Sequence, residues 1–83
     1  MIAEITKIIN GWDPIDLFPM APEDEYVREI ESLNIIVHDN PEISVDNLAV
    51  EIHQLFTKCF GSDVYLREKK ECLKVAYEIL KLR

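Results

Sequence analysis

The stretch GWDPIDLFPMAPEDEY, residues 11–26, decides how this chain can fold. It holds three of the four prolines, the only tryptophan and five of the sixteen acidic residues. Because a proline forces the residue before it toward extended geometry, Phe18 and Ala21 interrupt any helix that enters the stretch. The stretch therefore predicts a proline-braced connector between two helices.

Apolar residues on both sides of this connector recur at helical spacing. Isoleucines among the first ten residues predict a short first helix, which Asn10-Gly11 is expected to end. The pair Asp13-Pro14 has the residue types of a helix N-cap followed by a first helical position. It predicts a single isolated turn over residues 14–17.

A second helix is predicted over residues 22–38. Pro22 suits a first helical turn, and the acidic residues 23–25 follow it where negative charge complements the helix dipole. Four residues step by four, three and four along the chain and predict the buried face of this helix: Tyr26, Ile30, Leu33 and Val37.

The third helix has the most regular pattern. Ser44 is a suitable N-cap, Gly61 is expected to end the helix, and an apolar stripe between them includes Cys59. A fourth helix is predicted over residues 63–83. Its apolar surface is expected to be wide enough to touch two neighbours, with Leu66, Leu73, Ala76, Tyr77 and Leu80 on one face and Cys72, Val75 and Ile79 beside them.

The sequence predicts one all-α domain over residues 1–83. No stretch alternates with period two for long enough to form a convincing strand. Connections of about two to seven residues place sequential helices side by side. The expected architecture is a small orthogonal or up-down bundle of four principal helices.

The charge of the chain is unevenly distributed. The net charge is −7, and residues 1–57 carry twelve acidic and two basic side chains, whereas residues 58–83 carry four acidic and seven basic ones. Because phosphate contacts need clustered Lys and Arg, we expect no nucleic-acid partner. No apolar run is long enough to cross a bilayer, and no signal-peptide block opens the chain, so we expect a cytoplasmic protein without a membrane partner.

Residues for catalysis or for metal binding are few. Cys59 and Cys72 are the only cysteines and are expected to be reduced core thiols, without zinc-ligand spacing. His38 and His53 also lack a metal-binding spacing. A cysteine–histidine pair with His53 is conceivable, but both thiols are expected on apolar stripes, where a thiol is usually inert. We therefore predict no catalytic, metal-binding or cofactor-binding residues and no cofactor.

Trp12 and Phe18 have two possible roles. They can form an aromatic anchor for a partner, or they can fold inward and close one end of the bundle. The inward arrangement is favoured, because a small bundle gains most from covering its open ends.

Two motifs carry a resemblance to a known family: Trp12-Asp13-Pro14-Ile15-x-Leu17 and Ala21-Pro22-x-Asp24-Glu25-Tyr26. With them the chain resembles the bacterial family catalogued as domain of unknown function 1871, which is found in spore-forming bacilli. The resemblance spans essentially the whole chain and implies an all-helical cytosolic fold without an established activity. That family often has glycine where Asp16 stands, so the turn after Pro14 is expected to differ somewhat. The chain is also similar in character to small acidic immunity proteins, whose carboxylates cover a basic toxin.

The surplus of negative charge predicts a non-enzymatic protein–protein interaction module. The candidate protein-binding residues are Asp13, Asp16, Glu23, Asp24, Glu29 and Glu31. The expected partner is a basic protein, or a second copy whose basic last helix meets the acidic region. The alternative is a small-molecule or metal-dependent enzyme that uses the carboxylates of residues 13–25 together with His38.

Overall fold

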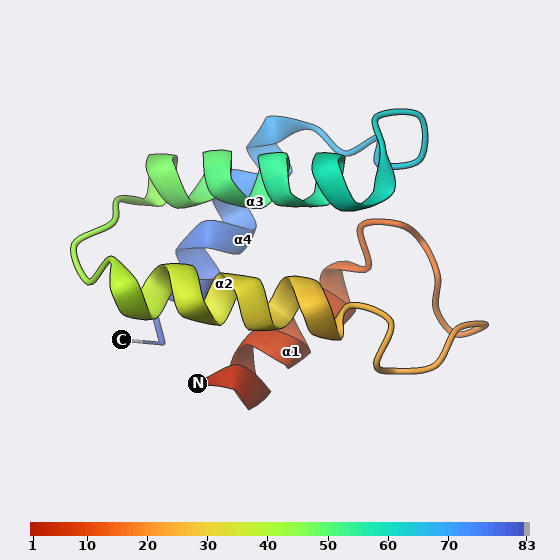
Figure 1. Cartoon of the computed structure of the whole chain (residues 1–83), viewed down its shortest axis with the longest axis horizontal. Helices are drawn as coiled ribbons and strands as arrows, with labels where there is room; N and C mark the ends of the chain where they lie inside the picture. Colours follow the sequence, from red (N-terminus) through yellow and green to blue (C-terminus); the bar gives the residue numbers. More distant parts are fainter. Residues whose placement is uncertain (83) are drawn as a thin grey trace.

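The computed structural model describes residues 1–82, and four α-helices account for the regular structure of this part of the chain (Figure 1). The helices are α1 (Ile2–Trp12), α2 (Val27–Asp39), α3 (Val45–Phe60) and α4 (Lys69–Leu80). The predicted all-α bundle of four principal helices is confirmed.

Each helix packs against two others. α1 contacts α2 and α4, and α3 contacts α2 and α4, so the four helices form a closed ring of contacts. Figure 1 shows α2 and α3 side by side and antiparallel, with α4 crossing behind them at a steep angle. Two long connectors link the helices: the first connector, residues 13–26, and the last connector, residues 61–68.

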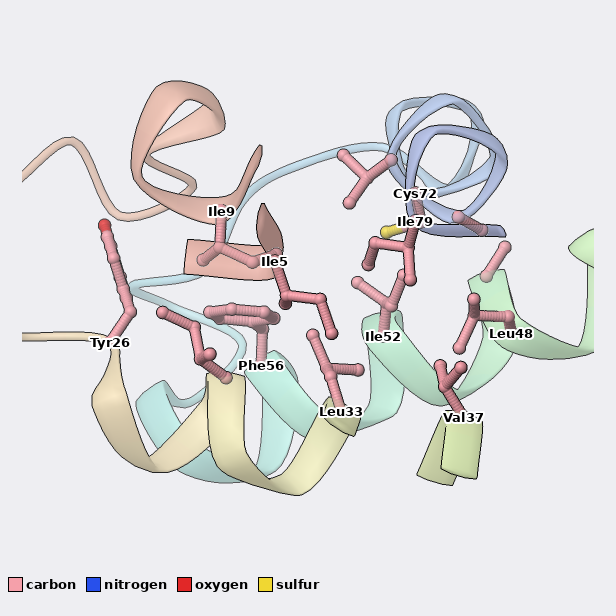
Figure 2. Close-up of a cluster of buried hydrophobic side chains, with 14 of the residues drawn as sticks. Ile5, Ile9, Tyr26, Leu33, Val37, Leu48, Ile52, Phe56, Cys72 and Ile79 are labelled. Carbon is pink, nitrogen blue, oxygen red and sulfur yellow. The ribbon is translucent and has the colours of Figure 1, made fainter. Parts of the chain in front are cut away.

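The core is formed by the inner faces of all four helices. Figure 2 shows Ile5 and Ile9 of α1 pointing toward Phe56 of α3, which is fully buried. The predicted buried face of the second helix is confirmed, because Tyr26, Ile30, Leu33 and Val37 are all buried. Each fully buried side chain of this size contributes about 1.5–3 kcal/mol through the hydrophobic effect.

The start of α3 follows its sequence signals. The Ser44 side chain accepts a hydrogen bond from the Asn47 N–H at 3.1 Å, and Gly61 ends the helix with a positive φ of 86°. In contrast, α1 continues through Gly11 to Trp12, beyond its predicted end. Asp13 then adopts the left-handed conformation, with φ 48°.

The predicted helical turn over residues 14–17 is wrong. Asp13 has left-handed instead of extended geometry, and its carbonyl accepts the Asp16 N–H at 3.0 Å, which forms a tight turn. Asp16 also has a positive φ, of 61°. Tight turns at this point allow the chain to leave α1 and return toward α2 within one short connector.

The second helix starts later than predicted. Residues 22–26 form turns, in which the Glu25 N–H donates to the Pro22 carbonyl at 3.3 Å and the Val27 N–H donates to the Asp24 carbonyl at 3.1 Å. The Tyr26 side chain is fully buried and its hydroxyl bonds Asp13. We attribute the delayed start to these tertiary contacts, which override a good local start signal at Pro22.

The fourth helix also starts later than predicted, at Lys69 instead of residue 63. The Glu68 N–H donates to Oε2 of Glu71 at 3.3 Å, as in a capping box. The residues that precede this helix form the last connector, and this connector places Tyr65 in the core. The helix ends at Leu80, and the predicted continuation to Arg83 reaches outside the described residues.

The predicted apolar surface of the fourth helix is buried only in part. Cys72, Val75, Ala76 and Ile79 are buried, whereas Leu66 and Tyr77 are 75% and 55% exposed. Leu66 lies in the last connector, so it does not share the helical register that the prediction assumed. The prediction of two buried thiols is correct for Cys72 and wrong for Cys59, which is exposed at the last turn of α3.

Candidate functional site

Asp13 organises the first connector. Its Oδ1 atom accepts hydrogen bonds from the Leu17 N–H at 2.9 Å and from the Tyr26 hydroxyl at 2.6 Å. Its Oδ2 atom accepts the Phe18 N–H at 3.0 Å. The Tyr26 hydroxyl in turn accepts the Ile15 N–H at 3.1 Å. One carboxylate therefore holds both halves of the connector together.

These contacts shift the pKa of both partners. Partial burial acts to raise the pKa of Asp13, but hydrogen bonds from Tyr26, Leu17 and Phe18 outweigh it and hold that pKa below its usual value of 3.8. Burial raises the pKa of Tyr26, and the hydrogen bond to Asp13 raises it further. Asp13 is thus an ionised acceptor and Tyr26 a neutral donor near neutral pH.

Arg67 joins the two long connectors. Its Nε atom donates to the Pro14 carbonyl at 3.1 Å, and its Nη2 atom donates to the Asp13 carbonyl at 3.3 Å. Next to it, the Trp12 indole N–H donates to Oε1 of Glu71 at 3.2 Å. These bonds fix the end of α1 against the start of α4.

Trp12 and Phe18 pack inward, as the sequence favoured. The Trp12 ring meets Phe56 edge to face, with ring centroids 5.5 Å apart, and the Phe18 ring meets Tyr26 in the same way at 5.7 Å. Both side chains are half-buried against the core. They close the end of the bundle at the first connector.

The structure separates the six candidate protein-binding residues into two groups. Asp16, Glu23, Asp24 and Glu31 are exposed on the first connector and on α2. Asp13 is half-buried and its carboxylate is occupied by internal hydrogen bonds, and Glu29 is buried. Only the exposed group is presented directly to a flat partner surface.

Carboxylates in the middle of the chain lack internal counter-ions. Ion pairs within residues 1–82 join Glu4 to the N-terminus and connect residues of the stretch 67–81. None of the twelve acidic side chains from Asp13 to Asp63 takes part in an ion pair in this described range. The carboxylates of α2 and its flanking loops therefore form no ion pair within the described part of the molecule.

Glu29 is the unusual member of the acidic set. It is 5% exposed, and its Oε1 atom is buried without a hydrogen-bond partner. Glu29 lines a hollow of about 380 Å³ between the start of α2 and the end of α3. The other residues that line this hollow are Asp24, Glu25, Val27, Arg28, Cys59 and Phe60.

Cys59 shares the hollow with Glu29. Burial raises the pKa of the Cys59 thiol, and the negative charge of Glu29 and a hydrogen bond with it raise that pKa further. Sequence reasoning counted Glu29 among surface carboxylates. Its spacing of three from Tyr26 and four from Leu33 was the signal that it belongs to the buried stripe of α2.

The residues proposed for an enzyme do not converge. Asp16 lines a hollow with residues of the last connector, Glu23 lines one with Asn10 and Phe18, and His38 lines a third near Met1. Among residues 1–82, no group of three or more His, Cys, Asp or Glu side chains has a geometry that could hold a metal ion.

A second polar cluster lies in the core. The Tyr65 hydroxyl is 3.0 Å from Sγ of Cys72 and 3.3 Å from Nδ1 of His53, and Sγ and Nδ1 are 4.0 Å apart. The conceivable Cys72–His53 pair is therefore present in space. However, Cys72 is fully buried, and burial raises the pKa of its thiol, which keeps it in the unreactive protonated form.

Comparison with known proteins gives no match to a family model, to a curated protein or to a solved structure. The resemblance to domain of unknown function 1871 stays a prediction from the two sequence motifs. Within residues 1–82, no helix has both the length and the apolar character required to cross a membrane.

Proposed function

We propose that this chain is a non-enzymatic protein-binding module that docks on a basic protein through an acidic face. We define the acidic face as the exposed carboxylates of the first connector and α2: Asp16, Glu23, Asp24, Glu25 and Glu31. The observation that carries the proposal is that none of these carboxylates has an ion-pair partner within residues 1–82. Charge of this kind is available to an external cation.

Physical considerations favour a basic partner. Like charges held on one compact domain repel one another, and a partner of opposite sign relieves this repulsion and speeds association by electrostatic steering. Such binding weakens as salt rises, because the Debye length falls from about 10 Å at 0.1 M to about 3 Å at 1 M. We place the interaction in the cytoplasm, where the two free thiols remain reduced.

The test is an affinity capture from extract of the source cell at low and high salt. The native chain is compared with a variant in which Glu23, Asp24, Glu25 and Glu31 are replaced by Gln. We expect a basic protein that the native chain captures at low salt, releases at high salt and loses in the variant.

A matched control removes the same number of charges elsewhere. Glu42, Asp46, Glu51 and Asp63 are also exposed and unpaired within residues 1–82, and all four are changed to their amides. This control should keep the partner. If both variants retain or both lose it, the acidic face is not the recognition surface.

Self-association is the second arrangement to be tested. The exposed lysines of α4, Lys69, Lys70 and Lys74, could meet the acidic face of another copy. Sedimentation over a range of concentrations at low salt distinguishes the two arrangements. A monomer at all concentrations would leave a separate basic protein as the partner.

A further inference from the structure

Glu29 is a buried acidic side chain with an unused acceptor. It is 5% exposed, its Oε1 atom has no hydrogen-bond partner, and no ion pair within residues 1–82 includes it. Burying a carboxylate oxygen without a hydrogen-bond partner is costly, because the water that it loses is not replaced. A ligand that supplies donors and positive charge would offset this cost.

The surroundings of Glu29 suit such a ligand. The hollow of about 380 Å³ is lined by the buried Glu29 and by three exposed charged side chains: Asp24, Glu25 and Arg28. Phe60 contributes a half-buried aromatic ring to the same hollow. The terminal torsion of a glutamate is broad and roughly two-fold, so rotation about this bond exchanges the two carboxylate oxygens.

We propose that this hollow binds the guanidinium group of an arginine side chain from the basic partner, with the Glu29 carboxylate as its anchor. The inference rests on the proposed function and specifies its central contact. Asp24 and Glu25 attract the cation, and the largely buried carboxylate of Glu29 holds it.

Guanidinium fits this site better than a lysine ammonium. The planar guanidinium group presents several N–H donors to one carboxylate. It is also more weakly hydrated than an ammonium group, so it loses less hydration free energy when it enters a partly buried site. It also stacks on aromatic faces, and Phe60 provides a ring in the wall of the hollow. An ammonium ion makes neither the bidentate contact nor the planar stacking.

The first experiment titrates the native chain with Nα-acetyl-arginine amide and follows backbone amide signals by NMR. We expect saturable shifts that centre on residues 24–29 and 59–60. Nα-acetyl-citrulline amide, which has nearly the same shape but no charge, should give no saturable shift. The corresponding lysine amide should bind at least about threefold more weakly. Equal binding of all three, or shifts centred on another region, would overturn the proposal.

Two isosteric variants test the anchor. Glu29→Gln should weaken arginine-amide binding by about tenfold or more, which corresponds to about 1.4 kcal/mol. Glu31→Gln removes the same charge from an exposed position of the same helix and should weaken binding less than about twofold. Equal losses would mean that only overall charge matters, and that result would also overturn the proposal.

A second measurement avoids the risk that Glu29→Gln disturbs folding. Cys59 is exposed at the hollow and Cys72 is buried, so N-ethylmaleimide should modify Cys59 selectively in the native chain. Saturating arginine amide should slow this modification several-fold relative to sodium chloride at the same ionic strength. An unchanged rate would count against occupancy of the hollow.

The two proposals fail in different ways. If the basic partner depends on the acidic face but not on Glu29, the arginine inference is overturned and the proposed function stands. If the acidic-face variant and its matched control behave alike in capture, the proposed function is overturned whatever the amide titration gives.

Discussion

The two long connectors are each held by a buried tyrosine, but in different ways. In the first connector, the Tyr26 hydroxyl donates to Asp13, a carboxylate of the same connector. In the last connector, the Tyr65 hydroxyl contacts His53 of α3 and Cys72 of α4. The tyrosine of the first connector therefore depends on one charge within that connector, whereas the tyrosine of the last connector contacts groups supplied by the helices around it.

The difference indicates which residues each connector needs. A loop built around a carboxylate should be sensitive to a single substitution and to pH. A loop anchored between two helices should lose less, because within residues 1–82 the hydroxyl of Tyr65 makes no bond to a carboxylate or to the backbone of its own connector.

Replacing the carboxylate should have the largest effect on stability. Asp13→Ala leaves the Leu17 and Phe18 N–H groups and the Tyr26 hydroxyl without their acceptor, and should lower the free energy of unfolding by about 2–3 kcal/mol. Asp13→Asn keeps a residue that tolerates positive φ and should lose less. Urea unfolding measures both variants. A loss below about 0.5 kcal/mol for Asp13→Ala would contradict the role of this carboxylate.

Removing the two tyrosine hydroxyls compares the connectors directly. Tyr26→Phe removes a charge-assisted bond and an acceptor of the Ile15 N–H, and should cost about 1–2 kcal/mol. Tyr65→Phe removes contacts to an imidazole and a thiol and should cost about 0.5–1 kcal/mol. Thermal and urea unfolding of both variants gives the ranking. The reverse order would mean that the last connector is the one that depends on its polar contacts.

Arg67 tests whether the connectors support each other. Arg67→Lys keeps the charge, but a lysine ammonium lacks the planar guanidinium group that donates to the Pro14 and Asp13 carbonyls at the same time. The substitution should lower the free energy of unfolding by about 0.5–1 kcal/mol. Arg28→Lys on the exposed start of α2 is the matched control and should be nearly neutral. If the two substitutions have the same effect, the connectors are stabilised independently.

The pH dependence should give the smallest effect. The pKa of Asp13 lies below its usual value of 3.8, so its ionised form is favoured in the folded chain. The stability that it contributes is present above that usual value and is lost as pH falls through the folded pKa. The advantage of the native chain over Asp13→Asn should therefore shrink on acidification. Unfolding of both chains at several pH values measures it, and a constant difference would contradict this assignment.

The sequence predicted regular elements well where local and tertiary preferences agree. Ser44, Gly61 and the apolar stripe between them define α3, and the spacing of Tyr26, Ile30, Leu33 and Val37 identified the inner face of α2. In these segments, the cap residues and the buried residues favour the same structure.

The predictions were wrong where a long-range contact decides the local conformation. Pro22 and Asp63 are suitable helix starts, but the chain remains non-helical to Tyr26 and to Glu68 while two tyrosines enter the core. Contacts between residues more than fifty positions apart, such as Arg67 with Pro14, have no periodic signal.

The candidate site was predictable in part. The concentration of carboxylates between Asp16 and Glu31 follows from the sequence alone, although their exposure does not, since Glu29 is buried. The hollow beside Glu29 could not be predicted from the sequence, because it depends on how the end of α3 approaches the start of α2. Cys59 was expected to be buried for a related reason: a helical stripe does not indicate where the neighbouring helix ends.

The bonds from Arg67 to Asp13 and Pro14 also determine when the first connector can complete its contacts during synthesis of the chain. They span 54 and 53 positions, and α1 has α4 as one of its two neighbours. A ribosome adds about 5–20 residues per second, so α1 and the first connector emerge several seconds before the residues that complete their packing. During that interval the first connector lacks the two bonds from Arg67. The chain can therefore present its acidic face in the native arrangement only after its fourth helix has been synthesised.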